Sequence, residues 1–208
     1  MSKRFFSKRN YCKVNVLSDV HADSIDMSYK VFNNRDGPAT PLIVLHGLLS
    51  TKLTWKSFCN HINEKSEPAR KVMAVDLRDH GDSPRTKIIT YPLIGEDIKK
   101  FLIKHNIKKS CFLGHCFGGR GLMWFALKYP DFIDRIIIAD ASTERATPFQ
   151  TVVPEMIKQL KTVKLPLGIN IIDARHEVKT QLEKNVFDKR LINFFLTNLY
   201  VKSDGRFV

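Results

Sequence analysis

The sequence predicts an α/β fold in which a mostly parallel sheet is covered by helices on both faces. Short apolar runs of strand length alternate with longer stretches of helical period between residues 41 and 140, and this alternation is typical of a doubly wound sheet. A glycine-rich segment, Gly-His-Cys-Phe-Gly-Gly at residues 114–119, stands between one apolar run and a helical stretch. A strand, a sharp turn and a helix in that order predict an exposed nucleophile at the turn.

Hydrophobic periodicity places the individual elements. Residues 27–33 alternate as a strand does, and a turn-forming segment follows them at residues 33–38. Apolar runs predict buried strands at residues 41–46, 71–76, 110–114 and 135–140. Apolar side chains recur at helical spacing over residues 53–62, 92–105 and 116–129. After Asp140 only helical stretches remain, at residues 149–160, 173–184 and 189–199.

Cys116 occupies the position in the turn where this motif places a nucleophile, usually a serine. The turn forces an unfavourable backbone conformation on residue 116, and the glycines around it let strand and helix pass close together. Free backbone N–H groups at the helix N-terminus favour an anion and lower the pKa of a thiol. The sequence therefore predicts a reactive thiolate at Cys116, and an inert cysteine in a decayed site is the alternative.

Two further motifs precede this turn. The apolar run at residues 41–48 ends in His46-Gly47-Leu48, and the run at residues 72–84 continues into Asp-Leu-Arg-Asp-His-Gly-Asp-Ser-Pro. The three motifs in this order resemble the α/β-hydrolase superfamily, and within it the branch of alpha/beta-hydrolase domain-containing protein 11 and related small acyl esterases. The resemblance extends from about Met27 to the end of the chain, where residues 197–208 are similar to the end of that branch's cap.

The resemblance implies a cofactor-independent hydrolase that acts on acyl esters or thioesters through an acyl-enzyme intermediate. Cys116 would be the nucleophile and Asp140 the catalytic acid that orients a histidine. The backbone N–H groups of Leu48 and Phe117 would form the oxyanion hole. The expected substrate is a small acyl ester or a lipid-like molecule. Residues 26–140 would form the N-terminal part of the hydrolase core, and residues 141–208 a helical cap region.

The catalytic histidine of the resembling enzymes lies in a loop after the last strand, and this chain has no residue in that place. The sequence ends at Val208, within the expected cap, so we expect two sheet strands with their helices to be missing from it. We therefore expect a chain truncated at its C-terminus, while a shortened isoform and a pseudoenzyme remain open. Of the other histidines, His46 and His80 belong to structural His-Gly motifs, and the side chain of His115 is expected to point away from Cys116. His61 and His105 are expected at helix ends, and His176 on the surface of the cap, where a role as the base is the weaker alternative.

Composition narrows the class of protein further. A chain of 208 residues with 43% hydrophobic residues suits one globular domain. No apolar run reaches the roughly 18 residues of a membrane span, so we expect no transmembrane segment. The cysteines, Cys12, Cys59, Cys111 and Cys116, have no metal-ligand spacing. They indicate free thiols in a reducing compartment, and neither a metal nor a cofactor is expected.

The net charge of +13 has two sources. The first 18 residues contain five basic side chains and no acidic one, the first acidic residue being Asp19. This composition of residues 1–25 is typical of a mitochondrial transit peptide. A basic tail of a cytoplasmic protein, or part of a first strand, is the alternative. The remaining lysines, such as Lys99, Lys100 and Lys104, indicate solvated helix faces. Because no aromatic and basic recognition motif accompanies them, we expect no nucleic-acid partner. Protein partners stay open.

Other patterns in the sequence are typical of different functions. Residues 114–121 lack the G-x-G-x-x-G spacing and the Gly-Lys-Ser/Thr ending of nucleotide-binding loops. Asp76, Asp79 and Asp82 could suggest a metal site, but their spacing follows the loop motif of the resembling family. The rival function is a non-catalytic protein of the same fold that binds an acyl group or a protein. A basic adaptor for an anionic membrane or RNA is a weaker hypothesis.

Overall fold

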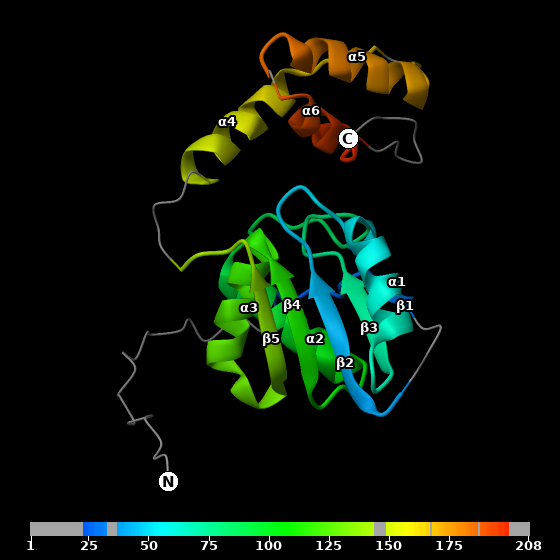
Figure 1. Cartoon of the computed structure of the whole chain (residues 1–208). Helices are drawn as coiled ribbons and strands as arrows, with labels where there is room; N and C mark the ends of the chain where they lie inside the picture. The colour runs from blue at the N-terminus through cyan, green and yellow to red at the C-terminus, as the bar shows by residue number, and fades with distance from the viewer. Residues whose placement is uncertain (1–22, 33–36, 144–148, 167, 187, 200–208) are drawn as a thin grey trace.

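The computed structural model describes the chain apart from residues 1–22, 33–36, 144–148, 167, 187 and 200–208. The expected transit peptide therefore lies outside the described residues, except for its last positions. The same holds for most of the cap-like segment at residues 197–208. In the described part, a sheet lies between two helical layers, and a separate group of helices lies beyond one end of its strands (Figure 1).

Five strands form one sheet in the order β1-β3-β2-β4-β5. Their bounds are Tyr29–Phe32 for β1, Ala39–Leu45 for β2, Arg70–Val75 for β3, Ser110–His115 for β4 and Ile133–Ala139 for β5. β1 runs antiparallel to β3, and every other neighbouring pair in this sheet is parallel. Parallel neighbours need crossover connections, which the helices supply. The predicted mostly parallel, doubly wound sheet is confirmed.

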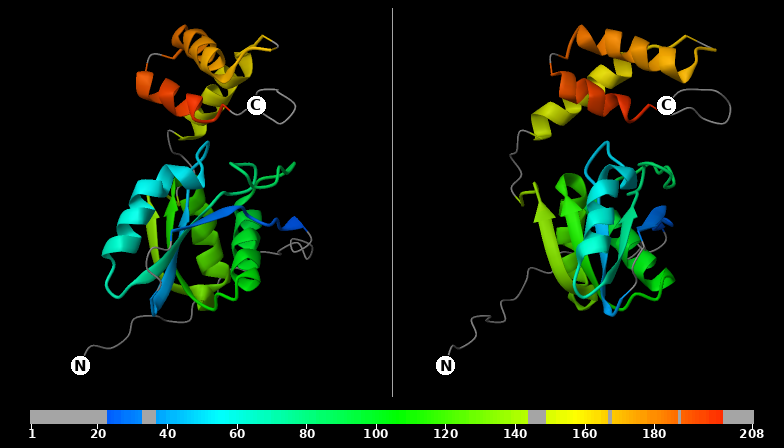
Figure 2. Two further views of the ribbon diagram at one scale, coloured as in Figure 1. Left: turned by 90° about the vertical axis from the view of Figure 1, so that its right-hand side faces the viewer. Right: turned by 45° about the vertical axis from the view of Figure 1, so that its right-hand side comes forward.

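Three helices cover the sheet on its two faces (Figure 2). They are α1 at Lys56–Lys65, α2 at Tyr91–Lys104 and α3 at Cys116–Lys128, and short 3-10 turns occupy Lys52–Trp55 and Pro130–Phe132. The 3-10 turn at Lys52–Trp55 and α1 together occupy the stretch for which one helix was predicted, at residues 53–62. Thr51 starts that stretch, because its side chain accepts a hydrogen bond from the N–H of Leu53. Thr90 caps α2 in the same way, with a proline in the first turn.

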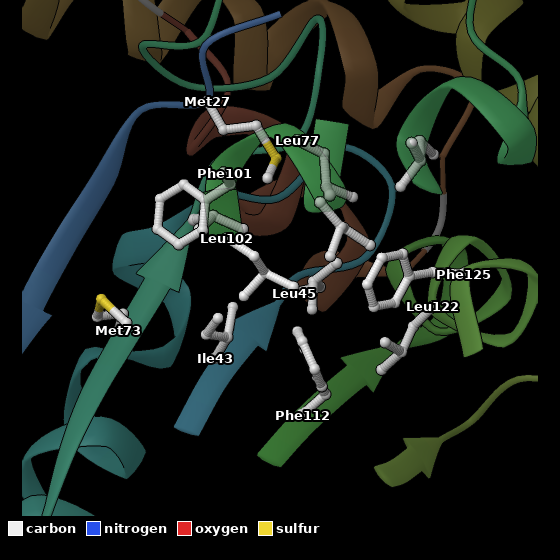
Figure 3. Packing of buried hydrophobic residues seen from close by; sticks show 13 residues of the cluster. Met27, Ile43, Leu45, Met73, Leu77, Phe101, Leu102, Phe112, Leu122 and Phe125 are labelled. Carbon is white, nitrogen blue, oxygen red and sulfur yellow. The ribbon is translucent and has the colours of Figure 1, made fainter. Parts of the chain in front are cut away.

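The core divides cleanly between the two faces of the sheet because side chains alternate along each strand. Ile43 and Leu45 of β2 belong to the cluster that packs against α2 and α3 (Figure 3). Leu42 and Val44 belong to a second cluster, which α1 covers with Cys59 and neighbouring aromatic side chains. Burial on both faces explains why these strands are continuous apolar runs in the sequence.

β5 is an exception to this pattern, and the prediction that it is a buried strand is wrong. It lies at the edge of the sheet and pairs only with β4 in the described structure. Ile136 and Ile137 are 38% and 56% exposed. Successive side chains of a strand point to opposite faces, so the described elements leave both faces of this edge strand partly uncovered.

Three helices, α4 at Phe149–Thr162, α5 at Ile171–Glu183 and α6 at Lys189–Leu196, lie over the carboxyl ends of the strands (Figures 1 and 2). Their own cluster consists of Val178 and Leu182 from α5 and Ile192 and Phe195 from α6. Leu49, from the loop after β2, packs against this cluster and so joins the group to the sheet. None of the described helices is both long and apolar enough to span a bilayer.

The exposure of β5 generates a stability prediction. Ile43→Ala, in a residue that is 1% exposed, is expected to lower the free energy of unfolding by about 2–5 kcal/mol. Ile137→Ala, on the edge strand, should lower it by less than about 1 kcal/mol. Urea unfolding of the two variants and the unmodified chain measures both changes. Equal losses would show that the outer side of β5 is covered in solution.

Candidate active site

The turn between β4 and α3 holds Cys116 in the strained conformation that the motif predicts. Its φ is 49°, in the left-handed region that residues other than glycine rarely adopt. α3 approaches the sheet so closely that a Cβ on Gly118 would lie 2.4 Å from the carbonyl oxygen of His46. Only glycine fits there. The turn therefore presents Cys116 as the first residue of α3, at the carboxyl ends of the parallel strands.

Two backbone N–H groups meet at the thiol of Cys116. Leu48 and Phe117 each form a backbone hydrogen bond to it. Leu48 comes from the loop after β2, and Phe117 is the next residue of the turn. The structure thus brings together the two donors expected for an oxyanion hole. Donors fixed in this way stabilise negative charge that develops during acyl transfer.

Burial opposes ionisation of this thiol. The pKa of Cys116 is raised, because the cost of burying the thiolate outweighs the hydrogen bonds from Phe117 and Leu48. The charge of Asp140 raises the pKa further, and Arg120 lowers it. The predicted lowering of the thiol pKa is therefore wrong in direction. Formation of the thiolate needs a proton acceptor or a higher pH.

Asp140 follows β5 directly and lies at the same edge of the sheet as Cys116. Its side chain is 89% exposed, and one carboxylate oxygen lies 4.0 Å from Nε2 of His115. The ring of His115 packs edge-on against Trp55, with 5.8 Å between ring centroids. Asp140 is thus placed where its charge reaches the thiol and where it faces an imidazole.

The remaining described histidines are engaged elsewhere. His46 and His80 are buried, as expected for structural residues of the two His-Gly motifs. His105 forms the C-cap of α2, whereas His61 and His176 are exposed on α1 and α5. Within the described ranges, His115 is therefore the histidine that faces Asp140.

His46 fixes the loop after β3. Its Nδ1 lies 2.7 Å from the carbonyl oxygen of Gly47, and its Nε2 accepts a hydrogen bond of 3.0 Å from the N–H of Leu77. A carbonyl only accepts and an N–H only donates, so the ring is neutral with its proton on Nδ1. Burial lowers the pKa of His46 to about 4, which keeps the ring in this form.

His80 fixes the loop after β2 in the same way. Its Nδ1 lies 2.8 Å from the carbonyl oxygen of Arg78, and its Nε2 accepts a 3.1 Å hydrogen bond from the N–H of Leu49. Burial lowers the pKa of His80 as well. Leu49 directly follows the donor Leu48, so this histidine supports one side of the site.

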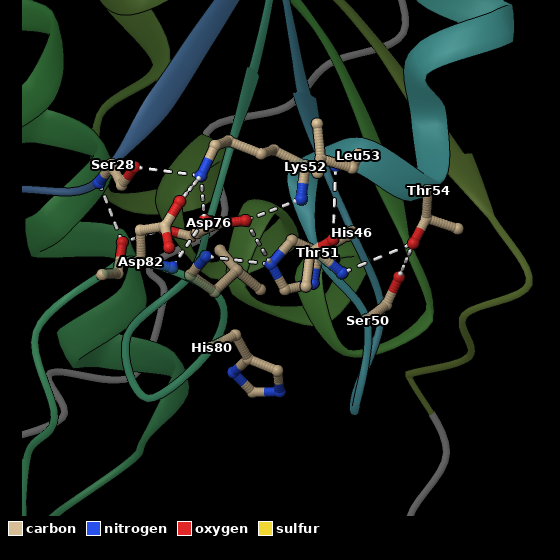
Figure 4. A network of polar contacts seen from close by, with 12 residues as sticks. Ser28, His46, Ser50, Thr51, Lys52, Leu53, Thr54, Asp76, His80 and Asp82 are labelled. Atoms are coloured by element: carbon tan, nitrogen blue, oxygen red, sulfur yellow. Dashed lines mark hydrogen bonds and ion pairs between the residues drawn. The ribbon is translucent and has the colours of Figure 1, made fainter. Parts of the chain in front are cut away.

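A buried ion pair joins the same two loops (Figure 4). Nζ of Lys52 lies 2.5 Å from one oxygen of Asp76 and 2.6 Å from Asp82, and it also donates to the hydroxyl of Ser28. The second oxygen of Asp76 accepts the backbone N–H of Lys52 at 2.6 Å. Although burial disfavours its charged form, the two carboxylates raise the pKa of Lys52. The sequence analysis missed Lys52, because nothing in its neighbourhood marks it as buried.

Arg78 anchors the same loop to α2. Its guanidinium forms two hydrogen bonds to Asp97, of 2.7 and 2.8 Å, and both side chains are 1% exposed. The other guanidinium donors reach the carbonyl oxygens of Ile88 and Asp23 at 3.1 Å. Ser83 adds a bond of 2.6 Å to the carbonyl oxygen of Asp76. Arg78, His80 and Ser83 therefore brace the turn.

A cavity of about 460 Å³ opens beside the candidate oxyanion hole. Leu48 and Leu49 line it from the sheet side, and Ile157 and Leu160 of α4 line it from the cap side. Its walls are mostly apolar, as in pockets that hold hydrocarbon groups. No cluster of three or more potential metal ligands occurs in the described part of the chain, including the aspartates near His80.

Comparisons with known proteins agree with this architecture. The α/β hydrolase fold family model matches residues 40–163. The sn-1-specific diacylglycerol lipase ABHD11 of Danio rerio is 33% identical over 178 residues, which are 86% of this chain and 55% of that protein. A probable alcohol acetyltransferase of Saccharomyces cerevisiae is 29% identical, over 95% of this chain and 61% of its own length. A marine microorganism esterase of known structure is 27% identical with a TM-score of 0.77, over 89% of this chain and 68% of that one.

These relatives are considerably longer than the chain described in this structure. The chain spans little more than half the length of the curated relatives that it matches. The part matched by the family model contains β2 from residue 40 onward, β3, β4 and β5, the turn at Cys116 and the loops that surround it.

Buried His46 generates a prediction for stability. Its folded-state pKa of about 4 lies below the ordinary value of 6.5. Between these values the unfolded chain binds more protons than the folded one, so the free energy of unfolding rises with pH. The stabilisation is complete at a pH above the unfolded-state pKa of 6.5, and it is lost as the pH falls toward the folded-state pKa of about 4. Urea unfolding across this range measures the slope. His46→Asn, which cannot titrate, should flatten it, and an unchanged slope would contradict the assignment.

Proposed function

The chain belongs to the α/β-hydrolase family, and we propose that it cleaves acyl esters or thioesters with Cys116 as the nucleophile. The observation that carries this proposal is the pair of backbone N–H groups, from Leu48 and Phe117, at the thiol. A cysteine that only fills space needs no such donors, whereas a nucleophile that places negative charge on a carbonyl oxygen does. The named relatives, a lipase and an esterase, support an ester as the substrate.

The reaction begins with removal of the thiol proton, because the raised pKa keeps the sulfur of Cys116 protonated. The sulfur then bonds to the carbonyl carbon, and the carbonyl oxygen takes the negative charge between the N–H groups of Leu48 and Phe117. Collapse of this intermediate breaks the bond to the alcohol or thiol, which leaves with a proton. A thioester remains on Cys116, and attack by water releases the acid.

The proposed role of Asp140 is to orient a histidine that accepts the thiol proton. A carboxylate next to an imidazole fixes its tautomer and stabilises the imidazolium that forms. Asp140 lies at the correct edge of the sheet, and its carboxylate already faces the ring of His115.

The substrate that we propose is a lipid-like or small acyl ester. The apolar side chains that line the cavity next to Leu48 come from the loop after β2, from Ile89 in the loop after β3 and from α4, and polar residues of the loop after β3 and of the cap complete its lining. Such walls suit an acyl chain whose carbonyl group reaches the two N–H donors. One relative is named a diacylglycerol lipase, which is consistent with this class of ligand.

A second candidate function is acyl binding without turnover. The observation that favours it is the raised pKa of Cys116, since a protonated thiol is a poor nucleophile. The same cavity would then hold the acyl group without a covalent step. Covalent trapping distinguishes the two functions.

The nucleophile is tested by incubating the chain with short p-nitrophenyl esters. We expect one equivalent of p-nitrophenol to be released and an acyl group to appear on Cys116 in a mass-mapped peptide. Cys116→Ala should abolish both signals, whereas Cys111→Ala, at a buried cysteine of β4, should keep them. Release that persists in Cys116→Ala would exclude this nucleophile. Absence of any acylation in the unmodified chain would favour acyl binding.

Asp140→Asn separates an electrostatic effect from a catalytic one. The charge of Asp140 raises the pKa of Cys116, so its removal should lower that pKa and accelerate alkylation by iodoacetamide at a fixed, near-neutral pH. If Asp140 also orients the base, the same variant should hydrolyse esters more slowly than the unmodified protein. Alkylation rates and ester turnover, measured side by side, give the two results. Faster alkylation together with undiminished turnover would contradict the catalytic role.

A further inference from the structure

The two peptide groups that flank the Cα of Leu49 are each held by a side chain. The N–H of Leu49 donates to Nε2 of His80 at 3.1 Å, and its carbonyl oxygen accepts a hydrogen bond of 2.8 Å from the side-chain amide of Asn198. The backbone of Leu49 has a φ of 54°, in the left-handed region. A leucine remains in that region only where its surroundings enforce it. His80 supplies that constraint from the sheet side, and Asn198 supplies it from the cap.

Asn198 is itself fixed within the cap. It follows α6, and its amide nitrogen also lies 3.2 Å from the carbonyl oxygen of Phe194. The side chain of Leu49 packs into the cluster formed by α5 and α6. Asn198 and Leu49 are 149 positions apart in the chain, so their bond forms only when the cap is seated on the sheet.

This contact lies one residue from the candidate oxyanion hole. The N–H of Leu48 hydrogen-bonds to the thiol of Cys116, and Leu48 directly precedes Leu49. Because peptide groups are planar, fixing both peptide groups around the Cα of Leu49 leaves only the dihedrals of Leu48 free to re-aim its N–H. A change at Asn198 therefore reaches the thiol through two residues of backbone.

We propose that Asn198 is a positioning residue that couples seating of the cap to the geometry of the oxyanion hole. When the cap is in place, its amide holds the carbonyl of Leu49 and keeps the N–H of Leu48 aimed at the reacting atoms. When the cap lifts, the bond is lost and the left-handed Leu49 can relax. The site is thereby complete only when the cap covers it. This inference rests on the proposed function of Cys116.

The obvious alternative is that the bond merely stabilises the cap. A structural role of that kind changes the free energy of unfolding and leaves the titration of Cys116 as it was. A positioning role changes the titration, because the N–H of Leu48 favours the thiolate over the thiol. The other charged groups that act on this thiol, Asp140 and Arg120, stay the same in every variant compared.

The experiment is the rate of alkylation of Cys116 by iodoacetamide against pH, read from mass-mapped peptides of the full chain. Asn198→Leu keeps the approximate size of the side chain and removes the donating amide without adding a charge. Thr180→Val is the matched control, because the hydroxyl of Thr180 donates to the carbonyl oxygen of His176 within α5 of the cap. Near neutral pH, Asn198→Leu should alkylate about two- to tenfold more slowly, the range for one lost hydrogen bond. Its profile should move to higher pH, and Thr180→Val should follow the unmodified chain.

A profile for Asn198→Leu that coincides with that of Thr180→Val, in protein with an unchanged circular dichroism spectrum, would overturn the proposal. Asn198→Ala and Asn198→Gln extend the test if the leucine variant does not fold: alanine should shift the profile, and glutamine should partly restore it. Alkylation does not require turnover. A shifted profile in a chain that hydrolyses no ester would therefore refute the proposed function and keep the positioning role.

Discussion

A reciprocal pair of hydrogen bonds holds the site together. The histidine after β2, His46, accepts the backbone N–H of Leu77 from the loop after β3. The histidine of that second loop, His80, accepts the N–H of Leu49 from the first. Each loop therefore supplies the acceptor that the other needs, and both acceptors exist only while the imidazoles are neutral. The position of Leu48, and with it one donor at Cys116, depends on this exchange.

Buried ions reinforce these loops rather than the hydrophobic core. A buried charge is tolerated when its partners satisfy it, and loss of one partner costs about 3–5 kcal/mol. Arg78 meets this condition through Asp97 and two backbone carbonyls. Lys52 meets it through Asp76, Asp82 and Ser28. In both cases the charged group spans elements distant in sequence, so it fixes where a loop lies at the end of the sheet. This placement, more than net stability, is what the ion pairs contribute.

The sequence alone predicts the sheet and the turn at Cys116. It does not predict features that depend on partners distant in the chain. Apolar runs located β2, β3 and β4 because burial on both faces leaves an unbroken signal. The burial of β5 was misjudged, since composition describes what a strand can bury and not whether a neighbour is present. The pKa of Cys116 was misjudged because it depends on burial by loops that no local pattern measures. Lys52 and Asn198 have partners 24 and 149 positions away, and neither lies in a motif that names its partner.

The hydrogen bonds to Cys116 in the free protein affect how strongly the site could accelerate a reaction. In the free protein, the N–H groups of Leu48 and Phe117 point to a sulfur that is mostly a protonated thiol and a weak acceptor. A carbonyl oxygen that acquires negative charge is a far stronger acceptor for the same two donors. Only interactions that strengthen on the way to the transition state accelerate a reaction. The two N–H groups make only weak hydrogen bonds to the thiol in the free protein. Catalysis is therefore favoured, because little free energy is lost when they bond to the substrate's carbonyl oxygen instead. The raised thiol pKa is the cost of the same burial, since the environment that strengthens the donors also disfavours the thiolate.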